Sequence, residues 1–342
     1  MDTFGTAELL GVVGAKQKFQ ALFLALFYPQ VYLSESEEIK LDKLDEDIDI
    51  AVTVSPVVGG KVIADQGYET RSFKAAYVKP KHEVDPSKMM KRRAGERLSG
   101  ALTMHQRREA QIAENMIKED LAIQQYEEKQ AVDAIVFGGY TVEGDGYPTQ
   151  QVEFGQRAEN RVTLGVGERW ADKDKATYDP TDDITEWASE SDGMINIMVM
   201  DSKAWALFHS FEAVKKKLDS RRGSTSVLET ALKDLGESVS FKGWFGDVQI
   251  VVSQHYYKEK GVKQRYLPDY CIVMGNTENQ GVRGYGAIKD AHAVREGMQQ
   301  TDRYPRNWIT DGDPAREYTM VQASPLMVPM NLNDFVVVIV GQ

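Results

Sequence analysis

Three aspartates near one another in the sequence, Asp179, Asp182 and Asp183, form the group best suited to metal chemistry. Carboxylate oxygens are hard ligands, and three of them could hold a divalent cation. The same residues open the segment "DPTDDITEWASESDG", where acidic side chains cap a helix and interact favourably with its dipole. Capping accounts for all three without a metal. The sequence therefore favours a structural role and leaves a metal-dependent enzyme as an alternative.

The other reactive side chains do not form a catalytic pattern. The histidines lack the spacing of metal ligands; they are His82, His105, His209, His255 and His292. The chain has no G-x-x-x-x-G-K-[ST] phosphate loop, no G-x-S-x-G motif and no H-E-x-x-H motif. Cys271, the only cysteine, lies in the apolar segment "DYCIVMG", where a buried, unreactive thiol is expected. We expect no catalytic residue, no cofactor and no metal.

Charge and hydropathy exclude further classes of protein. The formal net charge of -11 argues against a sequence-independent nucleic-acid binder, whose affinity comes from Lys and Arg. It fits a soluble surface, or one that lies near DNA without adsorbing it. No apolar run approaches the roughly 20 residues that span a bilayer, so no membrane is expected as a partner. A single cysteine excludes an intramolecular disulfide, and the reducing cytosol is the simplest place of synthesis.

The first third of the chain predicts a helix, an arm and a ribbon. Apolar residues recur at helical spacing within "FQALFLALF". The acidic run "SESEEIKLDKLDEDIDI" has too little apolar material for a core and reads as an extended arm or linker. Residues 51–84 contain two β-rich halves around the turn Asp65 to Gly67. Pro56 and Pro80 suit edge strands, and a two-stranded ribbon has only edges. Such a ribbon is marginal alone and must lean on its own body or on a neighbouring chain.

Residues 103–137 predict one long helix. Thr103 and Gln106 fit a capping box, and Gly138 with Gly139 provides the end. At 1.5 Å per residue the rod is about 50 Å long. Its apolar stripe is narrow and lacks a sustained heptad, which leaves a core helix packed on one side or a spine laid along a sheet.

The chain after Tyr140 predicts strands, short helices and turns. An apolar strand at 195–200 precedes a helix at 202–219, and the final stretch is extended and apolar. With no internal repeat, the fold class is α+β.

Seven segments together resemble a known family: "YVKPKHEV", "YDPTDDI", "WALF", "LDSRRGS", "LETALKDLG", "RYPRNW" and "GDPAREYTMVQASPLM". They resemble the lambda-like bacteriophage major capsid (head) proteins, the E family, over nearly the whole chain. The resemblance implies the tailed-phage major capsid fold. Laid on this sequence, the N-terminal arm is 1–50 and the extended hairpin loop is 51–86. The peripheral domain is 87–181 with its spine helix at 103–137, the axial domain is 182–285, and 286–342 returns to the peripheral domain.

The resemblance also implies a function and partners. The protein would assemble with itself, as hexamers and pentamers, into the icosahedral shell around phage double-stranded DNA, without sequence-specific binding. Scaffold and portal would act during assembly, the precursor would expand as DNA enters, and a decoration protein would bind the outside. Assembly would occur in the host bacterial cytoplasm and end in the virion. Candidate inter-subunit contacts are Phe19, Phe23, Tyr68, Phe73 and Tyr77, because aromatic residues dominate interface energetics. Another phage assembly component, such as a tail tube or scaffold, is the remaining alternative.

Overall fold

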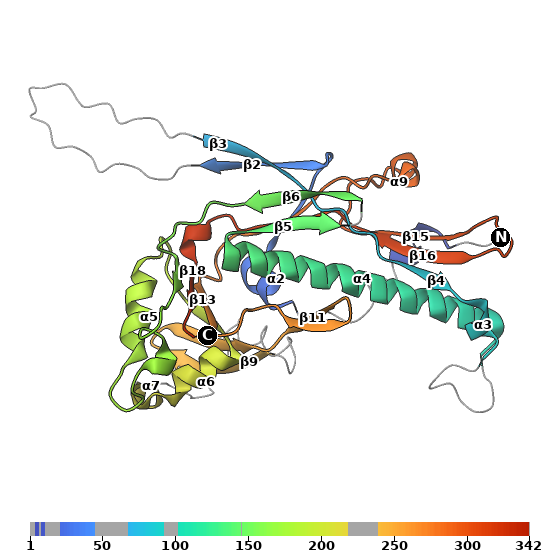
Figure 1. Cartoon of the computed structure of the whole chain (residues 1–342). Coiled ribbons are helices and arrows are strands. Elements are labelled where there is room, and N and C mark those ends of the chain that lie inside the picture. Colours follow the sequence, from blue (N-terminus) through green and yellow to red (C-terminus); the bar gives the residue numbers. More distant parts are fainter. Residues whose placement is uncertain are drawn as a thin grey trace, which may run out of the picture.

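The computed structural model describes residues 4–6, 8–10, 21–44, 68–91, 102–144, 146–217 and 239–341. A six-stranded mixed sheet forms one end of the molecule (Figure 1). Its strands, in spatial order, are β7 (Arg161–Thr163), β18 (Val336–Ile339), β13 (Cys271–Gly275), β8 (Ile197–Asp201), β10 (Val248–Ser253) and β9 (Val239–Phe245). Strands β7 and β18 come from outside the predicted axial range 182–285, so the compact unit takes strands from three separate parts of the chain.

Both faces of the six-stranded sheet are buried. Side chains alternate along β8, so Ile197 and Val199 face one core and Met198 and Met200 face the other. Three short helices supply the second core: α5 (Pro180–Ser189), α6 (Ser202–Ser210) and α7 (Glu212–Lys217). The helix predicted at 202–219 is thus two helices, because the chain breaks at Phe211, whose ring packs edge-on against Trp170.

The long helix α4 (Met104–Phe137) runs from this sheet to the opposite end of the molecule (Figure 1). The predicted ends are confirmed: Thr103 and Gln106 form the capping box, and Gly138 closes the helix with φ 72°. Among the described residues, no helix is both long and apolar enough to cross a bilayer.

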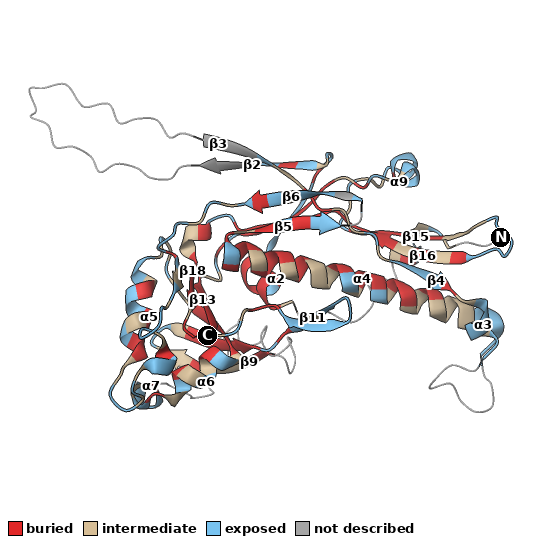
Figure 2. Ribbon diagram, viewed as in Figure 1, coloured by how far each residue is buried: buried red, intermediate tan, exposed pale blue. Residues whose placement is uncertain are grey.

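Three small sheets lie along α4. One contains β15 (Tyr304–Ile309), β16 (Glu317–Gln322) and β4 (Lys81–Val84); another contains β1 (Gln30–Leu33), β14 (Val282–Tyr285) and β17 (Pro325–Val328); the third is the hairpin of β5 (Gly139–Gly144) and β6 (Tyr147–Glu153). Buried residues follow the helix along its length (Figure 2). The short helices α2 (Leu22–Phe27), α3 (Pro86–Met89) and α9 (Ala291–Glu296) complete the body, with two single-turn 3-10 helices at Trp170–Asp172 and Leu332–Asp334.

A ribbon projects from this body. Strand β2 (Glu38–Leu44) pairs antiparallel with β3 (Tyr68–Lys74), from Glu38 opposite Lys74 to Leu44 opposite Tyr68. Residues 38–44 belong to the acidic run that predicted an extended arm or linker, and in the structure they form the first strand of the ribbon. The second strand of the ribbon ends at Lys74, before the predicted end of the second half at residue 84. Pro80 lies outside the ribbon and precedes β4, which pairs with β16. The predicted turn at 65–67 and Pro56 lie outside the described residues.

Candidate assembly surfaces and the spine that positions them

The three aspartates of α5 are engaged with protein groups. Asp179 caps the helix through the backbone N–H of Thr181 and accepts a bond of 2.6 Å from Lys217 Nζ. Asp183 accepts bonds from Trp170 Nε1 at 2.8 Å and the Tyr178 hydroxyl at 2.7 Å. Asp182 is exposed. Among the described residues, no group of three or more His, Cys, Asp or Glu could hold a metal ion. The predicted capping role is confirmed for Asp179, whereas Asp182 and Asp183 lie in the first turn of the helix and Asp183 binds Trp170 and Tyr178.

The cysteine and two of the histidines are buried or bonded to protein groups. Burial raises the pKa of the Cys271 thiol well above its ordinary value, and burial lowers the pKa of His255 to about 4. His82 Nδ1 lies 3.0 Å from Glu119 Oε1, on the buried side of α4. The His82 ring thus fastens β4 to the helix.

The buried face of α4 carries charge that the sequence analysis did not anticipate. Arg303 donates to Asp120 Oδ1 at 2.7 Å and to the two Glu127 oxygens at 2.7 and 2.9 Å. All three side chains are at most 9% exposed. Both carboxylates are thereby hydrogen-bonded to one guanidinium within the interior, where an unpaired charge would be very costly. The network ties the segment before β15 to the middle of the helix.

A second charged pair fastens β16 near the start of the helix. Arg108 binds Glu317 through Nε at 2.8 Å and Nη2 at 2.6 Å, the paired geometry that makes an Arg–carboxylate bond strong. Glu119, also on α4, accepts a bond of 2.8 Å from the Thr319 hydroxyl. The helix is thus held to its sheets by specific polar contacts as well as by apolar packing.

Glu128 connects α4 to the short helix α2. Its carboxylate accepts the backbone N–H groups of Phe23 at 2.8 Å and Leu24 at 3.1 Å. Helix α2 has no side-chain cap of its own, so Glu128 satisfies donors that would otherwise be unpaired. Burial raises the pKa of Glu128 to about 7, although these N–H groups favour the ionised form. Tyr28 adds a bond of 3.1 Å from its hydroxyl to the carbonyl oxygen of Ala131.

The base of the ribbon is anchored to the body. Ile39 is fully buried, and Phe73 packs against Phe154 with 5.4 Å between ring centroids. Glu37 pairs with Lys74 at 3.3 Å and also with Lys289. Within the described residues, β2 and β3 pair only with each other, so each strand keeps an unpaired backbone edge.

The predicted contact residues fall in different environments. Phe23 is buried in the core beside Phe27, so it is not available to another subunit in this conformation, and that expectation is corrected. Phe73 and Tyr77 are half-buried; the Tyr77 hydroxyl donates to Gln322 Oε1 at 2.7 Å. The backbone of Tyr68 is in β3. Phe19 and the side chain of Tyr68 lie outside what the structure describes.

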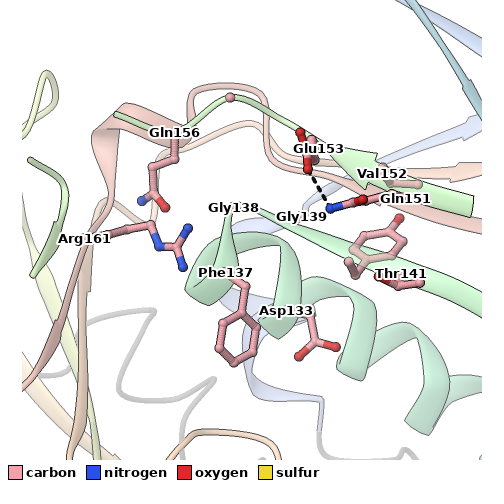
Figure 3. A pocket seen from close by; sticks show the side chains of 12 residues that line it. Asp133, Phe137, Gly138, Gly139, Thr141, Gln151, Val152, Glu153, Gln156 and Arg161 are labelled. Atoms are coloured by element: carbon pink, nitrogen blue, oxygen red, sulfur yellow. Dashed lines mark hydrogen bonds between the residues drawn. The ribbon is translucent and has the colours of Figure 1, made fainter. Parts of the chain in front are cut away.

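Two surface features were not predicted. A hollow of about 530 Å³ lies where α4 ends (Figure 3), and Phe137, Asp133, Glu153 and Arg161 are among its lining residues. Phe137 is 50% exposed, and exposed aromatic and arginine side chains are enriched at protein interfaces. Strand β1 is the outer strand of its sheet and exposes three apolar side chains, those of Val31, Tyr32 and Leu33. The sequence does not show the alternation of apolar and polar residues that predicts a strand, because all four residues of β1 are exposed.

This architecture, a long spine helix laid along small sheets with a projecting ribbon, is the fold of tailed-phage major capsid proteins. A crystal structure titled "putative capsid protein of prophage (E.coli CFT073)" matches with a TM-score of 0.84 and 33% identity, over 99% of each chain. The capsid structure of the cyanophage P-SCSP1u matches in fold with a TM-score of 0.50 and 10% identity, over 100% of this chain and 93% of that one. The predicted α+β capsid fold is confirmed.

The chain belongs to the family described as "Phage major capsid protein E", which matches residues 5–340. It is 48% identical to the major capsid protein of Escherichia phage lambda over 98% of both chains. It is 47% identical to the major capsid protein of Enterobacteria phage P21 over 99% of both. The protein is therefore a major capsid protein, a structural component of the virion and not an enzyme. The tail tube, scaffold and enzyme alternatives are not supported.

Proposed function

We propose that copies of this chain form a closed icosahedral shell, as hexamers and pentamers, around phage double-stranded DNA, and that the N-terminal arm and the ribbon join neighbouring copies. The observation that carries this proposal is the ribbon. A two-stranded ribbon is marginal in water, yet β2 and β3 project from the body with both outer edges unpaired among the described residues. A neighbouring subunit is the natural support in a shell.

The base of the ribbon packs directly against the spine helix. Ile39 and Phe73 belong to the same buried cluster as Ala134 of α4 and Leu326 of β17, so the anchored base packs with the helix. We retain Phe19 and Tyr68 as proposed contacts and assign Phe73 and Tyr77 to the anchored base. Exposed Val31 and Leu33 of β1 are further candidates, because an outer strand can accept a strand from another chain.

The finer organisation belongs to the same proposal. The parts along α4 would form the peripheral domain and the six-stranded sheet the axial domain, with expansion on DNA entry changing how α4 packs. Scaffold and portal would act during assembly in the host cytoplasm. A decoration protein would bind where the ribbon and arm of different copies meet.

Replacing residues 45–67 with Asn-Gly tests the ribbon's role. Leu44 and Tyr68 are direct partners, so the cut ends can be joined by a two-residue turn while the anchored base is kept. We expect a folded chain that fails to form shells in electron micrographs. A matched control replaces 45–67 with a Gly/Ser segment of equal length, which separates the reach of the ribbon from its side chains. Regular shells from the shortened chain would contradict the proposal.

A further inference from the structure

We propose that the hairpin of β11 (Tyr256–Glu259) and β12 (Val262–Arg265) presents a basic face that binds the phosphate backbone of double-stranded DNA. The inference rests on the proposed function, since it places this face toward the enclosed genome. Figure 1 shows β11 on the side of α4 away from the β5–β6 hairpin and the ribbon. The hairpin thus lies on the other side of the helix from the ribbon that is proposed to join neighbouring copies.

The turn of the hairpin holds one lysine at the tip. Lys260 and Gly261 have φ angles of 49° and 83°, so both central residues are left-handed, as in a two-residue type I′ turn. A left-handed conformation is uncommon for lysine, and the turn fixes where its side chain starts. Lys260 is exposed.

The strand register gathers positive charge on one face. Lys258 lies directly opposite Lys263, and Tyr256 directly opposite Arg265. Because side chains alternate along a strand, these four residues share a face. Like charges directly opposite one another destabilise a hairpin, so the Lys258–Lys263 pair costs stability when no anion is present. A phosphate group between them would remove that repulsion.

The lysines are available for a ligand. Lys258 and Lys260 are exposed and have no carboxylate partner within the described part of the chain. Lys263 Nζ lies 3.5 Å from the centroid of the Tyr256 ring, which orients the amine without neutralising it. Arg265 differs, because it is bonded to Asp201 Oδ1 at 2.6 Å and fastens the base of the hairpin to the body.

The opposite face of the hairpin turns toward the protein. Tyr257 packs against the core cluster that contains Ala131 and Val132 of α4, with its ring 5.0 Å from that of Tyr266. Glu259 interacts electrostatically with Lys129 of α4. The only acidic residue of the two strands thus interacts with the helix, whereas Lys258 and Lys263 lie on the other face of the hairpin. This separation of charge is what a polyanion-binding surface requires.

The number of lysines on this face sets the salt dependence of the interaction. Three lysines neutralise at most three phosphates, so the logarithm of the binding constant should fall with the logarithm of salt concentration with a slope of about −2.7. Such binding is weak for one copy and depends on salt. Many copies in one shell would hold DNA close without trapping it, which agrees with a surface that does not adsorb DNA strongly.

The test compares the full-length protein with Lys258→Gln/Lys260→Gln/Lys263→Gln. The control variant Lys79→Gln/Lys88→Gln/Lys216→Gln makes the same change in net charge at exposed lysines elsewhere. Fluorescence anisotropy with a labelled 30-base-pair duplex, at about 20 to 150 mM NaCl, gives affinity and salt slope. We expect about tenfold or greater loss of affinity and a near-zero slope for the hairpin variant only.

Three results would overturn the inference. These are no duplex binding by the natural sequence, equal weakening by both variants, and unchanged binding by the hairpin variant. Electron microscopy of each variant separates this inference from the proposed function. If the hairpin variant forms normal shells and keeps its DNA affinity, the proposed DNA contact is wrong and the proposed function stands. Loss of shells with unchanged DNA affinity would instead assign the hairpin to a neighbouring copy. Failure of the natural sequence to form shells would count against the proposed function.

Discussion

Replacing Glu128 with Gln should change how the stability of the chain depends on pH. Burial raises the pKa of Glu128 to about 7 from the ordinary 4.5. A carboxyl whose pKa is higher in the folded state is stabilising while protonated, so its contribution is complete below about pH 4.5 and is lost as pH rises through about 7. A shift of this size corresponds to about 3 kcal/mol, because each pH unit is worth about 1.36 kcal/mol.

The measurement is the free energy of unfolding in urea from pH 4.5 to 8, for unassembled full-length chain. Between pH 8 and 4.5 the natural sequence should gain about 3 kcal/mol relative to Glu128→Gln, whose amide does not titrate. Taking the difference cancels groups common to both chains, including Arg283, Tyr28 and Tyr266, which face the carboxylate. Glu109→Gln, a half-buried change on the same helix, is the control. A difference that stays constant with pH would refute the reasoning.

Three further substitutions test the spine and its surroundings. Arg303→Met should cost about 3 to 5 kcal/mol in urea unfolding, because Asp120 and Glu127 stay buried without a cation; adding hydrophobic replacements of both carboxylates should recover most of this loss. Gly284→Ala should destabilise by about 1 to 3 kcal/mol, since its Cβ would lie 2.7 Å from Ile39 Cδ1, and Ile39→Val should relieve the clash. Thr103→Ala removes the cap of α4 and should cost about 1 kcal/mol, with helix fraying visible as faster amide exchange near residue 104.

The long helix could be predicted in full because its ends are encoded locally. Thr103, Gln106 and Gly138 act within a few residues, and the structure uses each as expected. The same holds for α5, where Asp179 provides the cap. Local rules succeed where both partners of an interaction lie within one turn.

What the sequence could not reveal depends on distant partners. No local pattern marks Glu119, Asp120 and Glu127 as buried, because their partners Arg303 and Thr319 lie far along the chain. Residues 38–44 read as part of an extended arm or linker because the run is acidic, although Ile39 is deeply buried at the base of the ribbon. Lys258 and Lys263 of the β11–β12 hairpin can be placed on one face only when the pairing register of the two strands is known.

The route of the chain through α4 has a consequence for its synthesis. During synthesis, Asp120 and Glu127 have no partner until Arg303 has been made, and β18 can take its place between β7 and β13 only after Val336–Ile339 has been made. A polypeptide still on the ribosome therefore has an incomplete spine and a sheet with a gap in its interior. Truncated products would lack a finished body, so faulty copies would be excluded before any lattice could take them in.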